Sequence, residues 1–203
     1  MNNIKKILEE TKNVTIVAAT KYVDSTIMRE LYSNGINNFG ENRVQDLLKK
    51  QDELKDLNII WHFIGHLQRN KAAKIINKID YLHSLDSLKL AEMIEKNRTT
   101  KLKCFVELSL TDSPTKNGVK EENLEYFMNS LREFKNIEVI GFMAMTDKNM
   151  NDYEKQNVFK RAKLLKDRYY LPNLSMGMSD DYKIAIVEGA TFIRLGRILF
   201  SCE

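Results

Sequence analysis

The sequence predicts an α/β fold in which eight parallel strands and their helices close into a (β/α)8 barrel of the TIM type. Apolar, β-branched or aromatic runs alternate along the chain with stretches of helical periodicity, and such alternation is typical of right-handed crossovers between parallel strands. The strand-like runs number eight, the number at which a parallel sheet closes around a filled interior. No G-x-G-x-x-G follows the first run, which disfavours the competing open, doubly wound sheet.

Each strand is expected where an apolar run is followed by a polar turn. The expected strands cover residues 14–20, 36–40, 59–65, 79–83, 102–108, 137–143, 173–178 and 190–195. The expected helices cover residues 24–34, 42–56, 67–77, 86–98, 120–134, 150–167 and 181–188. Several of these helices begin with an Asp, Asn or Ser of the kind that caps helices.

The two ends of the chain bear on how the outer ring of helices is completed. Only RILFSCE, residues 197–203, follows the last strand, which is too little for a full eighth helix. Residues 2–12, NNIKKILEETK, are expected to cover that face from the other end of the chain. Because the chain has two prolines and neither a low-complexity segment nor a long linker, we expect a single domain over residues 1–203.

The composition excludes several classes of protein. With 43% hydrophobic and 30% charged residues, and with neither a secretory signal nor an apolar run of membrane-spanning length, the chain is expected in the cytoplasm without membrane contact. Its net charge of +4 comes from interspersed charges, so no nucleic-acid partner is expected. Cys104 and Cys202 form neither a metal pair nor a disulfide framework and are expected to be reduced thiols.

TIVAATKYVD, residues 15–24, is an apolar run that ends in Lys21. Active sites of (β/α)8 barrels lie at the carboxyl ends of the strands, and side-chain alternation places Lys21 on the same side as Val17. If Ile16 and Ala18 face the helices, Lys21 points into the mouth of the barrel. The alternative is a solvated lysine that simply ends the strand, which is the commoner situation for a charged residue.

A second stretch predicts a phosphate site. LSMGMSDD, residues 174–181, places Gly177 and Ser179 where the seventh strand turns into a helix capped by Ser179 or Asp180. A helix start presents unpaired N–H groups and the positive end of the helix dipole, which suit a phosphate. By itself this pattern is also that of an ordinary turn.

A third stretch brings the phosphate site to the lysine. TFIRLGR, residues 191–197, supplies Arg194, Gly196 and Arg197 at the end of the eighth strand. That strand neighbours the first strand once the barrel closes. A phosphate cradle beside a lysine suits a phosphorylated aldehyde held as a Schiff base on Lys21.

Five blocks of the sequence stand out as motifs: VAATKYVD with GINNFGENRVQD, WHFIGHLQRNK, HSLDS, GFMAM and SMGMSDDYKIAIVEGATFIRLGR. In the same order, they resemble the blocks of the pyridoxal phosphate (PLP) homeostasis protein family. Members are small single-domain PLP binders with the barrel of the amino-terminal domain of alanine racemase, which is fold type III among PLP proteins. The resemblance implies PLP as cofactor on Lys21, Ser179 and Gly196 as phosphate ligands, and Arg194 in contact with the phosphate or the pyridine nitrogen.

Further residues at strand ends are candidates for lining the cofactor. GENRVQD places Glu41, Asn42, Arg43 and Gln45 after the second strand, on the functional face. For Asn42, contact with the cofactor and a helix cap are alternatives. His66, after the third strand, is expected either to bond the ring oxygen of PLP or to cap a helix.

The remaining histidines and several methionines complete the set. His62, within the third strand, is expected either in the core or facing an interface. His83 is expected at the place on the fourth strand that corresponds to His66 on the third. Because three histidines on separate strands lack an aligned carboxylate, no metal site is expected. Methionines that flank the mouth are expected either to pack against the flat ring of PLP or to fill the core: Met143, Met145, Met176 and Met178.

Two stretches depart from the family pattern. ELSLTDSPTKNG, residues 107–118, keeps the lysine and glycine of the family's loop but not its serine, glycine and glutamate run, which leaves the role of this loop open. Arg197 stands where small polar residues are common and would add a positive charge near the phosphate.

Three functions compete. A PLP carrier needs only the lysine and the phosphate cradle. An amino-acid racemase also needs a second acid or base. In similar racemases a β-domain supplies that group, and this chain has no residues left for such a domain. A binder of another phosphorylated metabolite would use Lys21 only as a charge partner. Arg194 only donates hydrogen bonds, so it would keep the ring nitrogen unprotonated and weaken the electron sink. We therefore favour a PLP carrier without substrate turnover. We also expect a monomer, with apo PLP enzymes as recipients of the cofactor.

Overall fold

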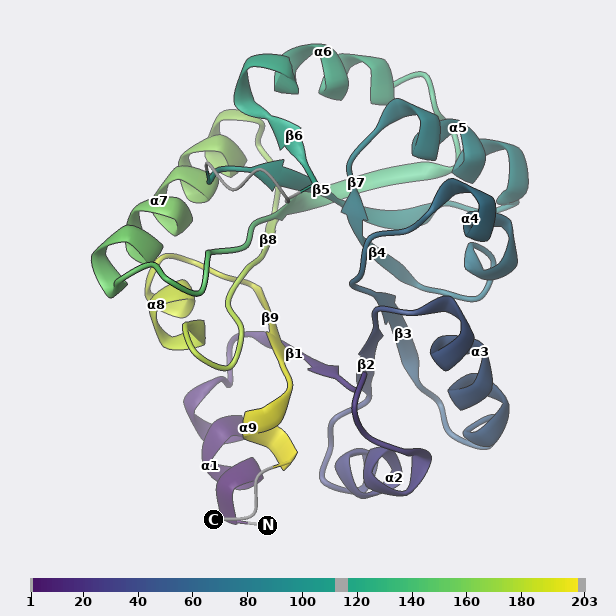
Figure 1. The fold of residues 1–203 in the computed structure, drawn as a ribbon, viewed down its shortest axis with the longest axis vertical. Helices are drawn as coiled ribbons and strands as arrows, with labels where there is room; N and C mark the ends of the chain where they lie inside the picture. The colour runs from purple at the N-terminus through teal and green to yellow at the C-terminus, as the bar shows by residue number, and fades with distance from the viewer. Residues whose placement is uncertain (1, 112–116, 201–203) are drawn as a thin grey trace.

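A computed structural model describes residues 2–111 and 117–200, in which eight parallel strands close into a ring (Figure 1). The ring strands are β1 (Thr15–Ala19), β2 (Asn38–Glu41), β3 (Ile60–Phe63), β4 (Tyr81–Leu85), β5 (Leu102–Ser109), β7 (Ile137–Met143), β8 (Asn173–Ser175) and β9 (Phe192–Leu195). Their order is β4, β3, β2, β1, β9, β8, β7 and β5, and a parallel pairing of β4 with β5 completes the ring. The predicted barrel and its eight strands are confirmed.

Strand β8 ends three residues earlier than predicted, the largest such difference among the ring strands. Residues 173–178 were expected as strand, but β8 stops at Ser175. The chain turns two residues later at Gly177, whose φ of +91° lies in the left-handed region that favours glycine. A two-residue strand that the sequence did not predict, β6 (Val119–Lys120), pairs with the end of β5.

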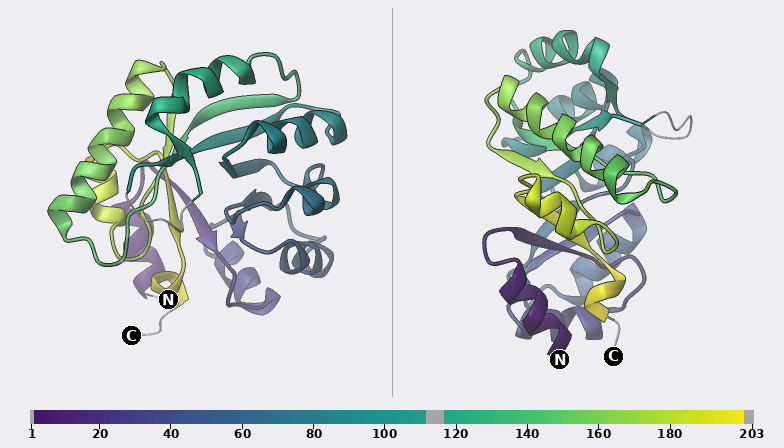
Figure 2. Two further views of the ribbon diagram at one scale, coloured as in Figure 1. Left: turned by 45° about the horizontal axis from the view of Figure 1, so that its top comes forward. Right: turned by 90° about the vertical axis from the view of Figure 1, so that its left-hand side faces the viewer.

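Helices surround the ring, as both views in Figure 2 show. They are α2 (Ser25–Ser33), α3 (Val44–Glu53), α4 (Arg69–Ile75), α5 (Leu88–Asn97), α6 (Glu121–Leu131), α7 (Asp152–Arg168) and α8 (Tyr182–Val187), with α1 (Asn2–Glu10) and α9 (Arg197–Phe200) at the two ends. Each helix predicted between two strands forms. Among the described residues, no helix combines the length and the apolar character needed to cross a membrane.

The first and last helices lie side by side at one edge of the molecule (Figure 1; Figure 2, right). Helix α9 has only four residues, as expected from the short segment after the last strand. On α1, Ile4 and Ile7 are buried in the main apolar core, and Glu10 accepts a hydrogen bond from the Tyr182 hydroxyl of α8 at 3.1 Å. The prediction that residues 2–12 cover this face is therefore confirmed.

Two separate cores hold the barrel together. The larger one lies between the strands and the helices, and a small cluster of Val17, Phe105, Ile140, Met143 and Phe192 fills the inside of the ring. Barrels of this kind usually fill their interior with layers of branched apolar side chains. Here polar side chains also occupy that interior and are buried: His62, His83, Ser175 and Arg194.

Candidate functional site

Lys21 lies in the turn after β1, at the carboxyl end of the ring, and is exposed to solvent. Its ammonium lies 4.8 Å from the centre of the Tyr22 ring. The predicted alternation along β1 is confirmed, since Val17 packs inside the ring while Ile16 and Ala18 pack against the helix layer. The amine is therefore accessible at the end of the barrel where sites of this fold occur.

A buried ion pair holds the residue before Lys21. Lys50 of α3 donates to the Glu41 carboxylate and to the Thr20 carbonyl, at 2.6 Å each, and the Thr20 hydroxyl donates to the same carboxylate oxygen at 2.5 Å. Glu41 was predicted on the functional face, which is wrong: it is fully buried and faces α3, because it shares the outward side of β2 with Phe39. The ion pair thus fixes the backbone from which Lys21 projects.

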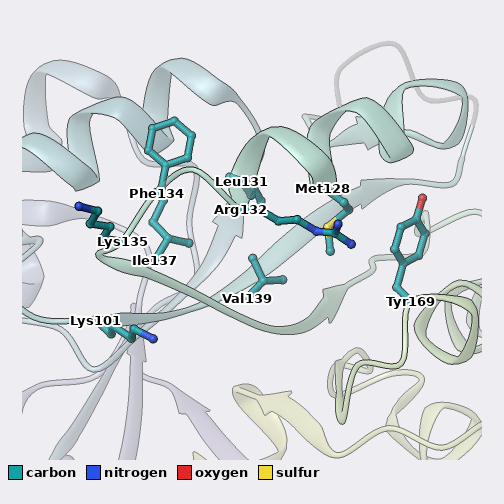
Figure 3. Close-up of a pocket in the computed structure, with 9 residues that line it drawn as sticks. All are labelled: Lys101, Met128, Leu131, Arg132, Phe134, Lys135, Ile137, Val139 and Tyr169. Atoms are coloured by element: carbon teal, nitrogen blue, oxygen red, sulfur yellow. The ribbon is translucent and has the colours of Figure 1, made fainter.

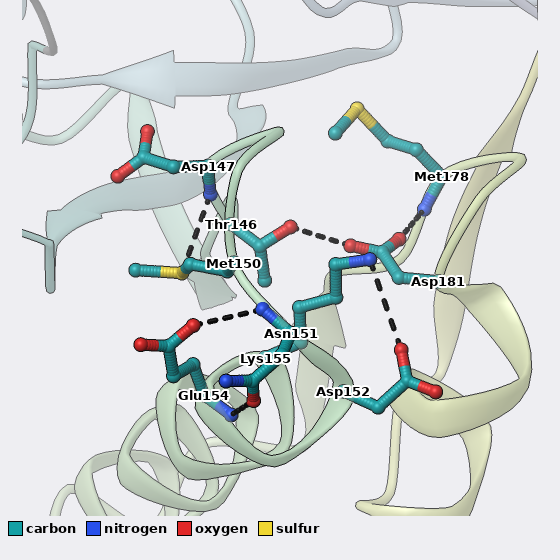
Figure 4. Close-up of polar contacts among 9 residues, drawn as sticks. All are labelled: Thr146, Asp147, Met150, Asn151, Asp152, Glu154, Lys155, Met178 and Asp181. Carbon is teal, nitrogen blue, oxygen red and sulfur yellow. Dashed lines mark hydrogen bonds and ion pairs between the residues drawn. The ribbon is translucent and has the colours of Figure 1, made fainter.

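The loop after β8 is fixed by Asp181 (Figure 4). One carboxylate oxygen accepts the Met178 amide at 2.6 Å, and the other accepts the Thr146 hydroxyl at 2.5 Å, which ties this loop to the segment after β7. Asp181 is also the N-cap of α8, so the prediction that Ser179 or Asp180 caps this helix is wrong. The Asp181 side chain makes no capping hydrogen bond to the helix, because both of its oxygens accept from residues that precede α8.

Ser179 and Gly196 come together at the mouth. The Gly196 amide donates to the Ser179 hydroxyl at 3.3 Å, which joins the loop after β8 to the end of β9. A Cβ at Gly196 would meet the Ala19 carbonyl oxygen of β1 at 3.6 Å, an ordinary van der Waals distance, so no atom crowds the backbone on that side. An amide and a hydroxyl on an uncrowded stretch of backbone fit a phosphate group. Arg197 instead contacts Asp180 at 3.4 Å on the surface.

Arg194 lies inside the ring, below that cradle. Its Nη1 donates to the carbonyl of Ser175 at 2.8 Å and to its hydroxyl at 2.6 Å, and its Nη2 donates to the Ala144 carbonyl at 3.2 Å. Burial lowers the pKa of the guanidinium to about 10, against the opposing effect of Asp181 and Glu107. The group therefore remains charged at neutral pH.

The two buried histidines lie side by side within the barrel. His62 stacks on Tyr81 with 4.5 Å between ring centroids, and His83 contacts Phe105 and Phe192. The core position of His62 is confirmed, but His83 does not lie at the mouth as predicted, because it faces inward from the middle of β4. Burial lowers the pKa of His62 to about 3 and that of His83 well below its usual 6.5.

Asn42 and His66 lie on the neighbouring part of the rim, where they line a cavity of about 560 Å³ together with Arg43 and Lys71. Neither caps a helix: Arg43 is the N-cap of α3, and α4 begins after Gln68. Asn42 Oδ1 is buried and has no hydrogen-bond partner among the described residues. His66 is half exposed, and its Nδ1 contacts the Asp86 carboxylate at 3.1 Å. Contacts of Asn42 and His66 with a cofactor stay predictions.

The four methionines do not all flank the mouth. Met178 lies exposed on the loop after β8, and Met145 is partly buried against the inner cluster. Met143 lies within that inner cluster and Met176 in the helix layer, so for these two the core-filling alternative is correct.

Two predictions fall partly outside the described residues. Of the two cysteines expected to be reduced, Cys202 lies outside the described residues. Cys104 is a free thiol that is fully buried, and burial raises its pKa. In the loop of residues 107–118, positions 112–116 with the loop's lysine lie outside the described residues. Gly118 has a φ of +123°, and a Cβ there would lie 2.9 Å from the Leu108 backbone.

A further cavity of about 530 Å³ lies at the opposite end of the strands (Figure 3). It is lined by Lys101, Met128, Leu131, Arg132, Phe134, Lys135, Ile137, Val139 and Tyr169. Ile137 begins β7 and Lys101 precedes β5, so this cavity lies at the amino ends of the strands, where barrels of this type do not place their sites. Within residues 2–111 and 117–200, no three His, Cys, Asp or Glu side chains are grouped to hold a metal ion.

Comparison with known proteins identifies the family. The model of the alanine racemase N-terminal domain family matches residues 1–203. A pyridoxal phosphate homeostasis protein of Aquifex aeolicus is 39% identical over 194 residues, covering 91% of this chain and 85% of that protein. PipY of Synechococcus elongatus, in its structure with PLP bound, is 32% identical with a TM-score of 0.90, covering 98% of this chain and 100% of that one. Alanine racemase from Corynebacterium glutamicum shares the fold, with a TM-score of 0.79 at 15% identity, covering 100% of this chain and 60% of that one. The chain therefore belongs to the alanine racemase N-terminal domain family and, within it, to the pyridoxal phosphate homeostasis proteins.

Proposed function

We propose that this chain binds PLP through Lys21 and serves intracellular PLP homeostasis as a carrier. The observation that supports the proposal is the contact between Ser179 and Gly196, because this amide and hydroxyl, which suit a phosphate, lie beside the strand that precedes Lys21. When bound, PLP supplies an aldehyde that condenses with an amine, and a phosphate and a pyridine nitrogen that accept hydrogen bonds.

Each residue of the site then has one task. The Ser179 hydroxyl and the Gly196 amide would hold the phosphate, and Lys21 would bind the aldehyde. Arg194 would serve the pyridine nitrogen rather than the phosphate, because its guanidinium is buried inside the ring and bonded to Ser175 and Ala144, whereas the phosphate ligands lie on the loops after β8 and β9. Asn42, His66 and Met178 would line the ring.

The titratable groups near the mouth support a carrier rather than an enzyme. Proton transfer in a racemase needs a second acid or base within reach of the reacting carbon. His83 is buried inside the ring, and His66 contacts Asp86 on the side of β3 and β4. Tyr22 is 80% exposed, so its side chain projects into solvent rather than being held in place as a second acid or base. We further propose that the protein acts as a monomer in the cytoplasm and delivers PLP to apo PLP enzymes.

Peptide mapping tests the attachment site. Purified protein is incubated with PLP, reduced with borohydride and digested, and the adduct is located by mass spectrometry. We expect it on Lys21 in the parent, its loss in Lys21→Ala, and its retention in Lys89→Ala, which changes an exposed lysine of α5. A stoichiometric adduct on another lysine would contradict the proposal.

Exchange in deuterated buffer tests the absence of turnover. PLP-loaded protein is mixed with each common L-amino acid, and the α-proton signal is followed together with the D-enantiomer. We expect no sustained exchange, but restored activity when the loaded protein is mixed with an apo PLP enzyme. Multiple-turnover exchange that disappears in Lys21→Ala would favour the racemase alternative instead.

A further inference from the structure

A continuous set of hydrogen bonds crosses the inside of the ring from Arg194 to Asn38. Arg194 Nη1 donates to the Ser175 hydroxyl at 2.6 Å, and this hydroxyl lies 2.7 Å from Nδ1 of His83. His83 Nε2 lies 2.9 Å from His62 Nδ1, and His62 Nε2 lies 2.9 Å from Asn38 Oδ1. We call these five residues the polar column.

The direction of every bond in the polar column follows from its two ends. A guanidinium only donates, so the Ser175 oxygen accepts from Arg194. The only other contact of the Ser175 hydroxyl among the described residues is His83 Nδ1, so its hydrogen is satisfied only if it is donated there. His83 must then carry its own hydrogen on Nε2 and donate it to His62.

The far end of the polar column agrees with this direction. His62, having accepted at Nδ1, carries its hydrogen on Nε2 and donates it to the Asn38 carbonyl oxygen. The Asn38 amide nitrogen donates in turn to the Asn37 side chain at 2.9 Å, which keeps the oxygen turned toward His62. The reverse direction would leave the buried Ser175 hydrogen without an acceptor, which costs free energy.

The polar column leaves part of the guanidinium unused. Its bonds occupy both N–H groups of Nη1 and one of Nη2, so the Nε hydrogen and the second Nη2 hydrogen of Arg194 have no acceptor among the described residues. Aromatic contacts of Tyr81 and Phe192 hold the histidine rings in place. A buried polar network of this kind is costly unless all its members are paired, and when they are paired it fixes a single geometry.

We propose that His83 and His62 are positioning residues, which act through Ser175 to hold Arg194 so that one of its unused N–H groups donates to the pyridine nitrogen of PLP. This inference rests on the proposed function. With His83 in place, the Ser175 hydrogen is committed and the oxygen faces Arg194. Without His83 the hydroxyl rotates, and the guanidinium loses a fixed acceptor.

Nitrogen NMR of the unaltered protein gives the first test. Histidine labelled with ¹⁵N reports which ring nitrogen carries the hydrogen, and we expect the Nε2–H form for both His62 and His83 at neutral pH. This measurement needs no substitution, so it does not depend on whether a variant folds. An Nδ1–H form, or a charged ring, at His83 would overturn the inference.

The second test asks whether the polar column acts on the ring nitrogen. Apparent dissociation constants are compared for PLP and for its 1-deaza analogue, in which a C–H replaces the ring nitrogen. We expect the parent to prefer PLP roughly tenfold, the worth of one charge-assisted hydrogen bond. Ser175→Ala and His83→Phe should lose most of that preference while binding the analogue nearly as well as the parent does. His83→Asn, which restores an acceptor for the Ser175 hydroxyl, should recover part of it.

A matched control separates positioning from general damage. Thr11→Val removes another buried hydroxyl, which donates to the Ile7 carbonyl at 2.6 Å in α1, and should leave the preference unchanged. Equal loss of affinity for PLP and analogue in Ser175→Ala and His83→Phe would show a merely structural role and overturn the inference. If the parent forms its adduct on Lys21 but Ser175→Ala and His83→Phe leave the preference for PLP over the analogue unchanged, only this inference fails. If no adduct forms on Lys21, the proposed function fails as well.

Discussion

Replacing Lys50 by Met should destabilise the protein strongly, because it leaves a buried carboxylate without its partner. The Lys50 and Glu41 side chains are 9% and 0% exposed and lie 2.6 Å apart. Breaking a buried pair from one side costs about 3–5 kcal/mol. The Thr20 carbonyl loses its lysine donor in the same step. We therefore expect the free energy of unfolding to fall by about 3–5 kcal/mol.

Two companion variants show whether burial is the cause. Lys49→Met changes the adjacent residue, which is 74% exposed and pairs with Glu53 at 3.7 Å, and such surface pairs contribute at most about 1 kcal/mol. Lys50→Met combined with Glu41→Leu removes both charges, so the double variant should be about 1–2 kcal/mol more stable than Lys50→Met alone.

Urea denaturation of the cofactor-free protein, followed by circular dichroism, measures these differences. The slope of free energy against urea should stay constant among the variants, so that midpoints compare directly. If Lys50→Met cost no more than Lys49→Met, the buried ion pair would not hold the segment before Lys21. A double variant less stable than Lys50→Met would refute the reasoning from an uncompensated charge.

Three further predictions concern pH and the loop after β8. The pKa values of His62 and His83 are lowered in the folded protein, so the unfolded state binds more protons below about pH 6.5. The free energy of unfolding should therefore fall from pH 6.5 toward pH 3, by up to ~1.4 kcal/mol per pH unit for each histidine. Urea midpoints measured across this range should depend less steeply on pH in His62→Phe than in the parent. Gly177→Ala should lower the thermal midpoint and cost about 2 kcal/mol or more, because φ is +91° and a Cβ would lie 2.6 Å from a neighbouring methyl group. Asp181→Ala should cost about 1–3 kcal/mol in urea denaturation, since two donors lose their acceptor, whereas the exposed Asp180→Ala should cost almost nothing.

Periodicity was sufficient to predict the barrel, but not the details of its strands. The alternation of Ile16, Val17 and Ala18 between helix layer and interior follows from the strand itself, so it could be predicted. The buried lysine could also have been found. Lys50 follows Val44 and Leu47 at intervals of three, on the buried face of α3, and a lysine on such a face needs a partner.

Contacts between distant strands were beyond sequence reasoning. Ring closure predicts that β9 neighbours β1, which was enough to bring Gly196 near Lys21. It does not say which inward side chains meet across the ring, and His83 and Ser175 are 92 positions apart. The start of α8 was missed for a local reason: Ser179, Asp180 and Asp181 are all residue types common at the N-cap, so the sequence does not distinguish among three consecutive candidates.

The paired strands β1 and β9 position Lys21 and Arg194, whereas the loop after β8 would supply Ser179 as a phosphate ligand. These two contributions to PLP binding can be tested separately. Val17 pairs with Arg194 in the register of β1 and β9, so backbone hydrogen bonds fix Arg194 relative to the strand that ends two residues before Lys21. Ser179 lies on the loop after β8, and its contact with Gly196 is the weaker of these constraints. Ser179→Ala should therefore weaken PLP binding by about 1 kcal/mol, or roughly fivefold, while the borohydride-reduced adduct stays on Lys21. A titration of PLP absorbance and a peptide map of the same sample measure the two effects. An adduct that moves to another lysine in this variant would mean that the loop, and not the register of the two strands, selects the reactive amine.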